Sequence, residues 1–129
     1  ALDQGYRNFI VPVGGSATND GGAGLLQALG VSLKNKAGKE IAYGGHELRN
    51  LEKIDVSGLD ERMLDSNIMV ACDVSNPLCG PRGASAIYGP QKGATFEQIQ
   101  ILDQALLKFS EIIKINLKKV NPNENISVF

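Results

Sequence analysis

The sequence has few of the residues from which many familiar kinds of site are built. It has 129 residues, no tryptophan, one histidine, two cysteines and 5% aromatic residues. Cys72 and Cys79 are too few for a disulfide scaffold, and their spacing fits neither a zinc knuckle nor a C-x-x-C redox motif. We expect two reduced thiols, as in a cytoplasmic protein. His46 follows two glycines in a turn, so we expect it to face solvent rather than act as a base.

The sequence also lacks an excess of charge and a long apolar run. Its formal net charge is −1 and its pI is about 5.8. This balance gives no basic field for nucleic acid and no polybasic membrane anchor, and the three tyrosines form no stacking platform for bases. There is no signal peptide, and no apolar run approaches the roughly 18 residues that span a bilayer. We therefore expect neither a nucleic-acid nor a membrane partner.

What is present is the composition of an ordinary globular domain. Hydrophobic residues make up 43% and charged residues 21%, and the length fits one domain over residues 1–129. Residues 1–5 resemble the last turn of a helix closed by glycine, and the chain does not begin with methionine. We therefore expect a fragment of a larger protein. The sequence makes no prediction about its oligomeric state.

Apolar segments alternate with turn residues along the chain. This pattern predicts an α/β or α+β fold, with a mixed sheet flanked by helices. Residues 8–13 and 67–74 are apolar runs typical of buried strands, although Pro12 argues against a central position for the first. Between these runs we expect a helix from about residue 22 to Gly30, a hairpin at 31–41, a short helix at 45–50 and a strand at 53–56.

The last part of the chain predicts one long amphipathic helix over residues 95–119. Thr95 and Gln98 have the spacing of a capping box at its start. Residues 76–93, just before it, contain glycine and proline and predict a loop with a short helical turn. The helix carries an apolar stripe at alternating spacings of three and four, formed by Ile99, Leu102, Leu106, Phe109 and Ile113.

The first candidate site is the segment 14–24, GGSATNDGGAG. Five glycines in eleven positions let the backbone form a nest of N–H groups at a helix start, which suits an anion. Asp20 is its one charge and can bind Mg²⁺ or accept a proton from a hydroxyl, but turn formation and helix capping by Asn19 and Asp20 are the alternative. The segment matches neither a Walker A loop nor G-x-G-x-x-G. Its candidate binding residues are Gly14, Gly15, Ser16, Thr18, Asn19, Gly21 and Gly22.

Two further clusters follow in the second half of the chain. Asp73 ends the apolar run at 67–74, where a carboxylate needs a partner or a cleft, and Asn76 comes soon after; an Asx-type turn is the alternative. Arg82 and Lys92 are flanked by glycine and proline on stiff loops that suit phosphate binding, with Gln91 beside Lys92. A solvated surface pair is the alternative for the two cations.

In this order, the three clusters resemble the type 1 glycerate kinase family. The matching segments are 14–24 with LQALG after it, ACDV at 71–74 with NPL at 76–78, and GPRGA at 80–84 with GPQKGA at 89–94. The resemblance covers the chain from residue 1 to about residue 118. The family usually has glycine where this chain has Pro12, and proline fixes φ and removes an N–H group.

The resemblance implies an activity. Members of the family transfer the γ-phosphoryl group of ATP to D-glycerate with Mg²⁺, and they are two-domain α/β proteins with the active site between the domains. This chain would then be one part of such an enzyme, inactive alone, with the missing domain of the same polypeptide as its partner. The alternative is a non-catalytic anion-binding or interaction module that retains the motifs.

The resemblance also implies roles for the candidate residues. Asp20 and Asp73 become the candidates for hydroxyl activation or Mg²⁺ ligation. The segment 14–24 would contact phosphate or the glycerate carboxylate. Arg82 and Lys92 would balance the negative charge of the phosphate or carboxylate groups.

Overall fold

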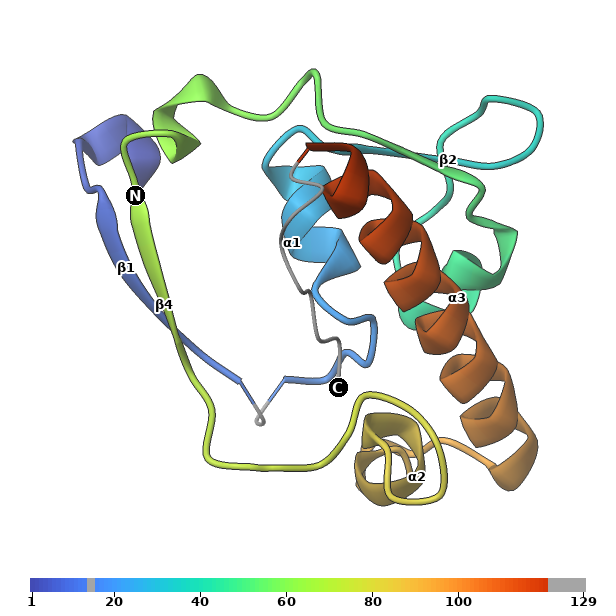
Figure 1. The fold of residues 1–129 in the computed structure, drawn as a ribbon. Coiled ribbons are helices and arrows are strands. Elements are labelled where there is room, and N and C mark those ends of the chain that lie inside the picture. The colour runs from blue at the N-terminus through green and yellow to red at the C-terminus, as the bar shows by residue number, and fades with distance from the viewer. Residues whose placement is uncertain (14–15, 121–129) are drawn as a thin grey trace.

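A computed structural model of the protein describes residues 1–13 and 16–120, so Gly14, Gly15 and residues 121–129 lie outside the described part. In Figure 1, β1 and β4 run side by side along one edge of the molecule, and α1 lies between them and α3. The predicted α/β class, with strands flanked by helices and a long C-terminal helix, is confirmed, but the strands form two separate two-stranded sheets rather than the one mixed sheet expected. The elements, with η for 3₁₀ helices, are η1 (Leu2–Gln4), β1 (Asn8–Pro12), α1 (Ala23–Ala28), β2 (Ser32–Lys34), η2 (Gly45–Asn50), β3 (Lys53–Asp55), η3 (Glu61–Met63), β4 (Asn67–Ala71), α2 (Ala84–Tyr88), η4 (Pro90–Lys92) and α3 (Phe96–Val120).

The first sheet is the parallel pair β1–β4, which pairs Asn8 with Asn67 and Pro12 with Ala71. The prediction that these are buried strands is wrong, because all of β4 is exposed and Ile10 of β1 is 72% exposed. A parallel sheet is normally covered on both faces, but among the described residues this pair faces α1 on one side only. The cleft between them has a volume of about 390 Å³ and a lining of mostly apolar side chains. The second strand also ends at Ala71, so the expected residues 72–74 are not part of it.

Pro12 is accommodated as the last residue of β1. The N–H group that donates to the Ala71 carbonyl belongs to Val13, at 3.1 Å. Since successive backbone N–H groups of a strand point to opposite sides, the nitrogen of Pro12 points away from β4. The missing N–H group therefore removes no hydrogen bond from the β1–β4 pair.

The second sheet is the antiparallel pair β2–β3, in which Leu33 lies opposite Ile54. The hairpin expected at residues 31–41 is confirmed in its turn, where Asn35 Oδ1 accepts hydrogen bonds from two backbone N–H groups, and in a bridge between Lys34 and Glu40. The strand that pairs with β2 over its whole length is β3, which follows η2 in the sequence. The short helix expected at 45–50 is confirmed as the 3₁₀ helix η2, and the strand expected at 53–56 is confirmed as β3, which ends at Asp55.

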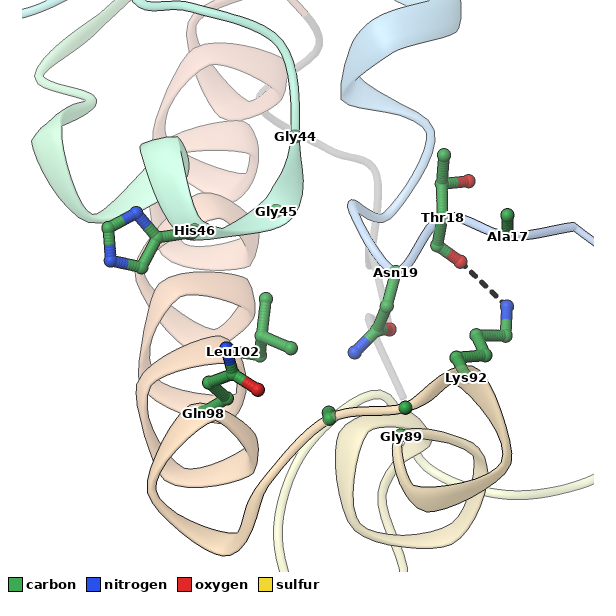
Figure 2. Close-up of a pocket in the computed structure, with 12 residues that line it drawn as sticks. Ala17, Thr18, Asn19, Gly44, Gly45, His46, Gly89, Lys92, Gln98 and Leu102 are labelled. Carbon is green, nitrogen blue, oxygen red and sulfur yellow. Dashed lines mark hydrogen bonds between the residues drawn. The ribbon is translucent and has the colours of Figure 1, made fainter.

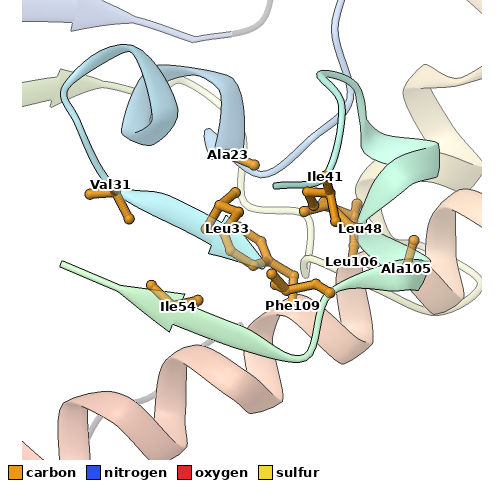
Figure 3. Packing of buried hydrophobic residues seen from close by; sticks show 10 residues of the cluster. Ala23, Val31, Leu33, Ile41, Leu48, Ile54, Ala105, Leu106 and Phe109 are labelled. Carbon is orange, nitrogen blue, oxygen red and sulfur yellow. The ribbon is translucent and has the colours of Figure 1, made fainter. Parts of the chain in front are cut away.

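The core lies where α3 packs against η2 and the β2–β3 sheet. Leu106 and Phe109 of the predicted apolar stripe are completely or almost completely buried, whereas Ile99, Leu102 and Ile113 are half-buried. Figure 3 shows Leu106 and Phe109 beside side chains from other segments, among them Leu33 of β2 and Ile54 of β3. The core consists of Ala23, Val31, Leu33, Ile41, Leu48, Leu51, Ile54, Ala105, Leu106 and Phe109.

The start of α3 has the predicted capping box. The Thr95 N–H donates to Gln98 Oε1 at 2.8 Å, and the Gln98 N–H donates to Thr95 Oγ1 at 3.3 Å. The preceding segment is more helical than expected, because it contains both α2 and η4. Within residues 1–13 and 16–120, no helix is both long and apolar enough to cross a membrane.

The two cysteines are unpaired, as expected. Cys72 is exposed, and Cys79 is half-buried near Asp103. Burial raises the pKa of the Cys79 thiol, and the Asp103 carboxylate raises it further. A raised pKa keeps the thiol protonated and makes Cys79 a packing residue rather than a nucleophile.

An ion-pair network joins the first residues to the segment before β4. Arg62 Nη1 lies 2.7 Å from Asp3 Oδ1, and Arg62 Nη2 lies 2.6 Å from Asp60 Oδ2. The side-chain hydrogen bond from Arg62, helped by the Arg62 backbone N–H, lowers the pKa of Asp60 from 3.8 to about 2. Because the folded pKa is depressed, the stabilisation is present above pH 3.8 and is lost as the pH falls toward about 2.

We expect Asp60→Asn to remove this acid-dependent part of the stability. The wild-type Tm should fall more steeply than the variant Tm between about pH 5 and about pH 2, since only wild type loses the Asp60 contribution there. Thermal unfolding across this range measures the difference. Asp65→Asn is the control, because Asp65 is exposed and makes no hydrogen bond or ion pair among the described residues. Parallel wild-type and Asp60→Asn curves would contradict the prediction.

Candidate functional site

The loop between β1 and α1 is organised around Asp20. Its Oδ1 accepts a hydrogen bond from the Gly22 N–H at 3.0 Å, and its Oδ2 accepts one from the Gly24 N–H at 3.1 Å. Gly22 is the N-cap residue before α1 and Gly24 lies in its first turn, where helix donors lack partners within the helix. Asp20 therefore stabilises the helix start, as the capping alternative expected.

Glycine is needed at the two positions after Asp20 for different structural reasons. Gly21 has a φ of +61°, and a Cβ there would lie 3.2 Å from both Leu106 Cδ2 and Phe109 Cδ1. A side chain at this position would press into the core, so Gly21 brings the loop close to α3. Gly22 has a φ of +84° with open space around it, so its requirement is the left-handed backbone alone.

Beside this loop lies a cleft of about 630 Å³, the size of a small-molecule site. Figure 2 shows it between His46 and Gln98 on one side and Thr18 and Lys92 on the other, with Asn19 between them. Three separate regions of the chain form its walls: the loop before α1, the start of η2, and the segment from η4 into α3. It is lined by Ala17, Thr18, Asn19, Gly44, Gly45, His46, Gly89, Lys92, Gly93, Ala94, Gln98 and Leu102.

Lys92 is the charged residue at the mouth of this cleft. Its Nζ donates to the Thr18 carbonyl oxygen at 2.7 Å and lies 3.4 Å from Ser16 Oγ. Among the described residues no carboxylate lies within ion-pair distance of Lys92. The ammonium is therefore held by neutral groups and its positive charge is not balanced locally. This arrangement suits an anionic ligand.

Asn19 is held from two sides. Its Nδ2 donates to Ser85 Oγ at 2.9 Å, and Ser85 is completely buried in α2. On the other side, the backbone of Gly45 comes so close that a Cβ there would overlap the Asn19 carbonyl oxygen. Asn19 thus lies in the cleft with both its main chain and its carboxamide restrained.

The remaining predicted residues do not line the cleft. Asp73 is exposed in the segment after β4, and Gln91 is exposed in η4. Asn76 is engaged internally, since its Oδ1 accepts from Tyr88 Oη at 2.5 Å and its Nδ2 donates to the Arg82 carbonyl at 3.0 Å. Arg82 itself is exposed. Of the predicted residues, the cleft therefore brings together Thr18, Asn19 and Lys92, with Ser16 bonded at its edge; Gly14 and Gly15 lie outside the described residues.

Sequence reasoning missed several residues of the cleft. His46 is exposed, as expected, but lies on its rim with Nδ1 3.4 Å from Glu47 Oε1. Gly45 follows Gly44, and this Gly-Gly pair was the one local feature of the sequence that indicated a close approach of the backbone to another segment. Gln98 and Leu102 gave no such signal, because one belongs to the capping box and the other to the apolar stripe.

A metal site is not preassembled in the described part of the chain. Within residues 1–13 and 16–120, no group of three or more His, Cys, Asp or Glu side chains is placed to hold an ion. Mg²⁺ commonly takes one or two carboxylates together with substrate phosphates and water. Among the described residues, Asp20 and Asp73 are therefore single carboxylates rather than members of such a group.

Comparison with known proteins decides the family. A family model described as "Glycerate kinase family" matches residues 1–125. The chain belongs to the glycerate kinase family. It is 59% identical over 112 residues to a glycerate kinase of Haemophilus influenzae, covering 87% of this chain and 30% of the relative. It is 55% identical over 114 residues to a glycerate 2-kinase of Escherichia coli K12, covering 88% and 30% respectively.

The fold agrees with a solved glycerate kinase structure. A crystal structure assigned to glycerate kinase 2 of Salmonella typhimurium LT2 matches with a TM-score of 0.84 and 54% sequence identity. The match covers 88% of this chain and 31% of that one. This chain therefore spans about 30% of the length of the glycerate kinases that it matches.

Proposed function

We propose that the protein containing this chain is an ATP-dependent glycerate kinase, which transfers the γ-phosphoryl group of ATP to a hydroxyl of D-glycerate. The observation that carries the proposal is the cleft in which Lys92, Thr18 and Asn19 meet. Its ammonium, hydroxyl and carboxamide groups suit a small ligand that carries both negative charge and hydroxyls. Membership of the glycerate kinase family supports glycerate or the transferred phosphate as that ligand.

The residues of the cleft would bind and orient rather than react covalently. Phosphoryl transfer depends mainly on positioning and on stabilising charge that spreads over the phosphate oxygens. Lys92 would donate to a phosphate or carboxylate oxygen, and its present bonds to Thr18 and Ser16 hold it in place for this role. Asn19 and Thr18 would hydrogen-bond the hydroxyl groups of glycerate. Arg82 and Gln91 would act only if substrate extends beyond this cleft.

Mg²⁺ would accompany ATP and neutralise charge on its phosphates. We assign its protein ligand to Asp73 in preference to Asp20. Both oxygens of Asp20 already accept backbone hydrogen bonds at the start of α1, whereas Asp73 is exposed and has no hydrogen bond among the described residues. Carboxylate oxygens are the side-chain ligands that Mg²⁺ prefers.

The roles of the two carboxylates are tested by one variant each. In the full-length protein, Asp73→Asn should lower kcat/KM about tenfold with an unchanged Tm, because asparagine keeps one oxygen ligand and the site is exposed. Asp20→Ala should reduce the free energy of unfolding by about 1–2 kcal/mol, because it removes both acceptors from the start of α1. Steady-state kinetics at varied Mg²⁺ and chemical unfolding measure the two effects. An Asp73→Asn enzyme with wild-type kinetics would remove Asp73 from the metal site.

We also propose that the rest of the polypeptide covers the β1–β4 sheet. The exposed apolar side chains of this sheet include Ile10, Met69 and Val70. A two-stranded parallel sheet is not a stable unit by itself, since parallel sheets occur with both faces covered. The same missing part would supply the opposite wall of the substrate cleft.

The decisive experiment compares the full-length protein with the 129-residue chain. Each is incubated with ATP, Mg²⁺ and D-glycerate, and phosphoglycerate is measured by mass spectrometry. We expect product from the full-length protein only, and only with all three reactants present. A full-length protein that binds phosphate but forms no phosphoglycerate would be the non-catalytic anion-binding module instead.

A further inference from the structure

We propose that Ser85 is a positioning residue that fixes the carboxamide of Asn19 for substrate binding. The inference rests on the proposed function, because it concerns the same cleft. Ser85 does not line the cleft itself, and its side chain is completely buried. Its hydroxyl accepts the hydrogen bond from Asn19 Nδ2 across 66 positions of sequence.

A carboxamide needs such a partner to present a defined face. Asparagine has an acceptor and a donor of nearly the same shape, and rotation about its last torsion exchanges them. The bond to Ser85 engages Nδ2, so Oδ1 remains as the acceptor that Asn19 offers to a ligand hydroxyl. Without that bond, the carboxamide would sample several orientations and bind the hydroxyl less well.

Ser85 can hold Asn19 because α2 is itself firmly anchored. At its end, Tyr88 Oη donates to Asn76 Oδ1 at 2.5 Å. The loop before α2 is tied to α3, where Asp103 Oδ1 accepts from the Gly80 N–H at 2.9 Å. These bonds fix α2 between the loop and the long helix, so its serine is a stable reference point for the cleft.

The same serine also organises the turn that carries Lys92. The Ser85 carbonyl oxygen accepts from the Gly89 N–H at 3.0 Å, and the Gly89 carbonyl accepts from the Lys92 N–H at 3.0 Å. A Cβ at Gly89 would overlap the Ser85 carbonyl, so glycine is required for this close approach. Ser85 therefore contacts both walls of the cleft, through its side chain on one side and its backbone on the other. Substitution by alanine removes only the side-chain contact.

Ser85→Ala in the full-length enzyme tests the contribution of the Ser85 hydroxyl alone. We expect the KM for glycerate to rise about fivefold, in line with the loss of one orienting hydrogen bond, while kcat changes less than about twofold. In an Asn19→Ala background the same Ser85→Ala change should have no further effect on KM. An unchanged KM for Ser85→Ala, or an equal rise in both backgrounds, would overturn the proposal.

Ser110→Ala is the matched control for stability. Ser110 is also buried, and its hydroxyl donates to the Leu107 carbonyl at 2.7 Å within α3, away from the cleft. We expect a similar change in Tm with no change in KM. A KM for Ser110→Ala that rises as much as that of Ser85→Ala would overturn the positioning role.

Crystal structures of full-length wild type and Ser85→Ala test the inference without an activity assay. Displacement, multiple orientations or an exchange of hydrogen-bond partners at the Asn19 carboxamide in the variant would support it. A carboxamide with unchanged position, order and remaining partners would overturn it. A wild-type enzyme without glycerate kinase activity would defeat the proposed function alone, because the two structures would still decide the role of Ser85.

Discussion

Replacing Lys92 with methionine in the full-length protein should lower kcat/KM for glycerate phosphorylation about 100- to 1000-fold. Lys92 is the one lysine or arginine among the described residues that line the cleft, and no carboxylate among them neutralises it. Methionine keeps much of the side-chain volume but removes the charge that would stabilise the transferred phosphoryl group. Steady-state kinetics with varied ATP and glycerate would measure the loss and separate kcat from KM.

Lys108→Met provides the control for this substitution. Lys108 Nζ also donates to a backbone carbonyl, that of Arg49, at 3.1 Å, and it pairs with Glu52 at 2.9 Å. It therefore anchors one segment to another as Lys92 does, but outside the cleft. We expect Lys108→Met to lower Tm without lowering kcat/KM. If Lys92→Met retained kcat/KM within about threefold of wild type, the charge-stabilising role would be wrong.

Gly45→Ala should both destabilise the protein and damage the cleft. The added Cβ would overlap the Asn19 carbonyl oxygen and lie 3.0 Å from Leu102 Cδ2. Because the nearest obstacle is backbone, relief requires the loop before α1 to move. We expect the free energy of unfolding to fall by about 2–3 kcal/mol and kcat/KM to fall about 100-fold, since small displacements of binding groups have large kinetic effects.

Gly38→Ala separates backbone strain from steric overlap. Gly38 has a φ of +75° with no neighbour within 4 Å of an added Cβ, and it lies in the turn after β2. We expect a loss of about 1 kcal/mol with normal kinetics. Chemical unfolding and kinetics of both variants make the comparison. Normal activity in Gly45→Ala would mean that the loop tolerates the shift, contrary to the prediction.

Short-range patterns in the sequence were sufficient to predict several parts of the fold. The capping box at Thr95 and Gln98 and the stripe through Leu106 and Phe109 predicted α3 to within one residue at each end. Hydrophobic periodicity and capping both depend on residues three or four positions apart, so they can be recognised without tertiary structure. The glycine-rich motifs identified the family for the same reason, because each is a short contiguous segment.

Other parts of the fold and of the candidate site could not be predicted from local sequence, because they depend on contacts between segments distant in the chain. Apolar runs at 8–13 and 67–74 indicated strands but not their exposure, since burial depends on which elements cover them. The turn of the hairpin at 31–41 was predicted correctly. The strand that pairs with β2 along its length is β3, however, which lies after η2 in the sequence. Asn76 had the composition of a binding residue, yet its carboxamide is engaged by Tyr88 and Arg82.

The sequence by itself therefore determined the family, the long helix α3 and the identity of Lys92 as a candidate anion-binding residue. Only the tertiary structure decided which motif residues share one cleft. It joined Thr18 to Lys92 across 74 positions and Asn19 to Ser85 across 66, and brought Gly45 against the same loop. The physical reason is that hydrogen-bond geometry and close packing arise from the folded path of the chain, which no local pattern of residues contains.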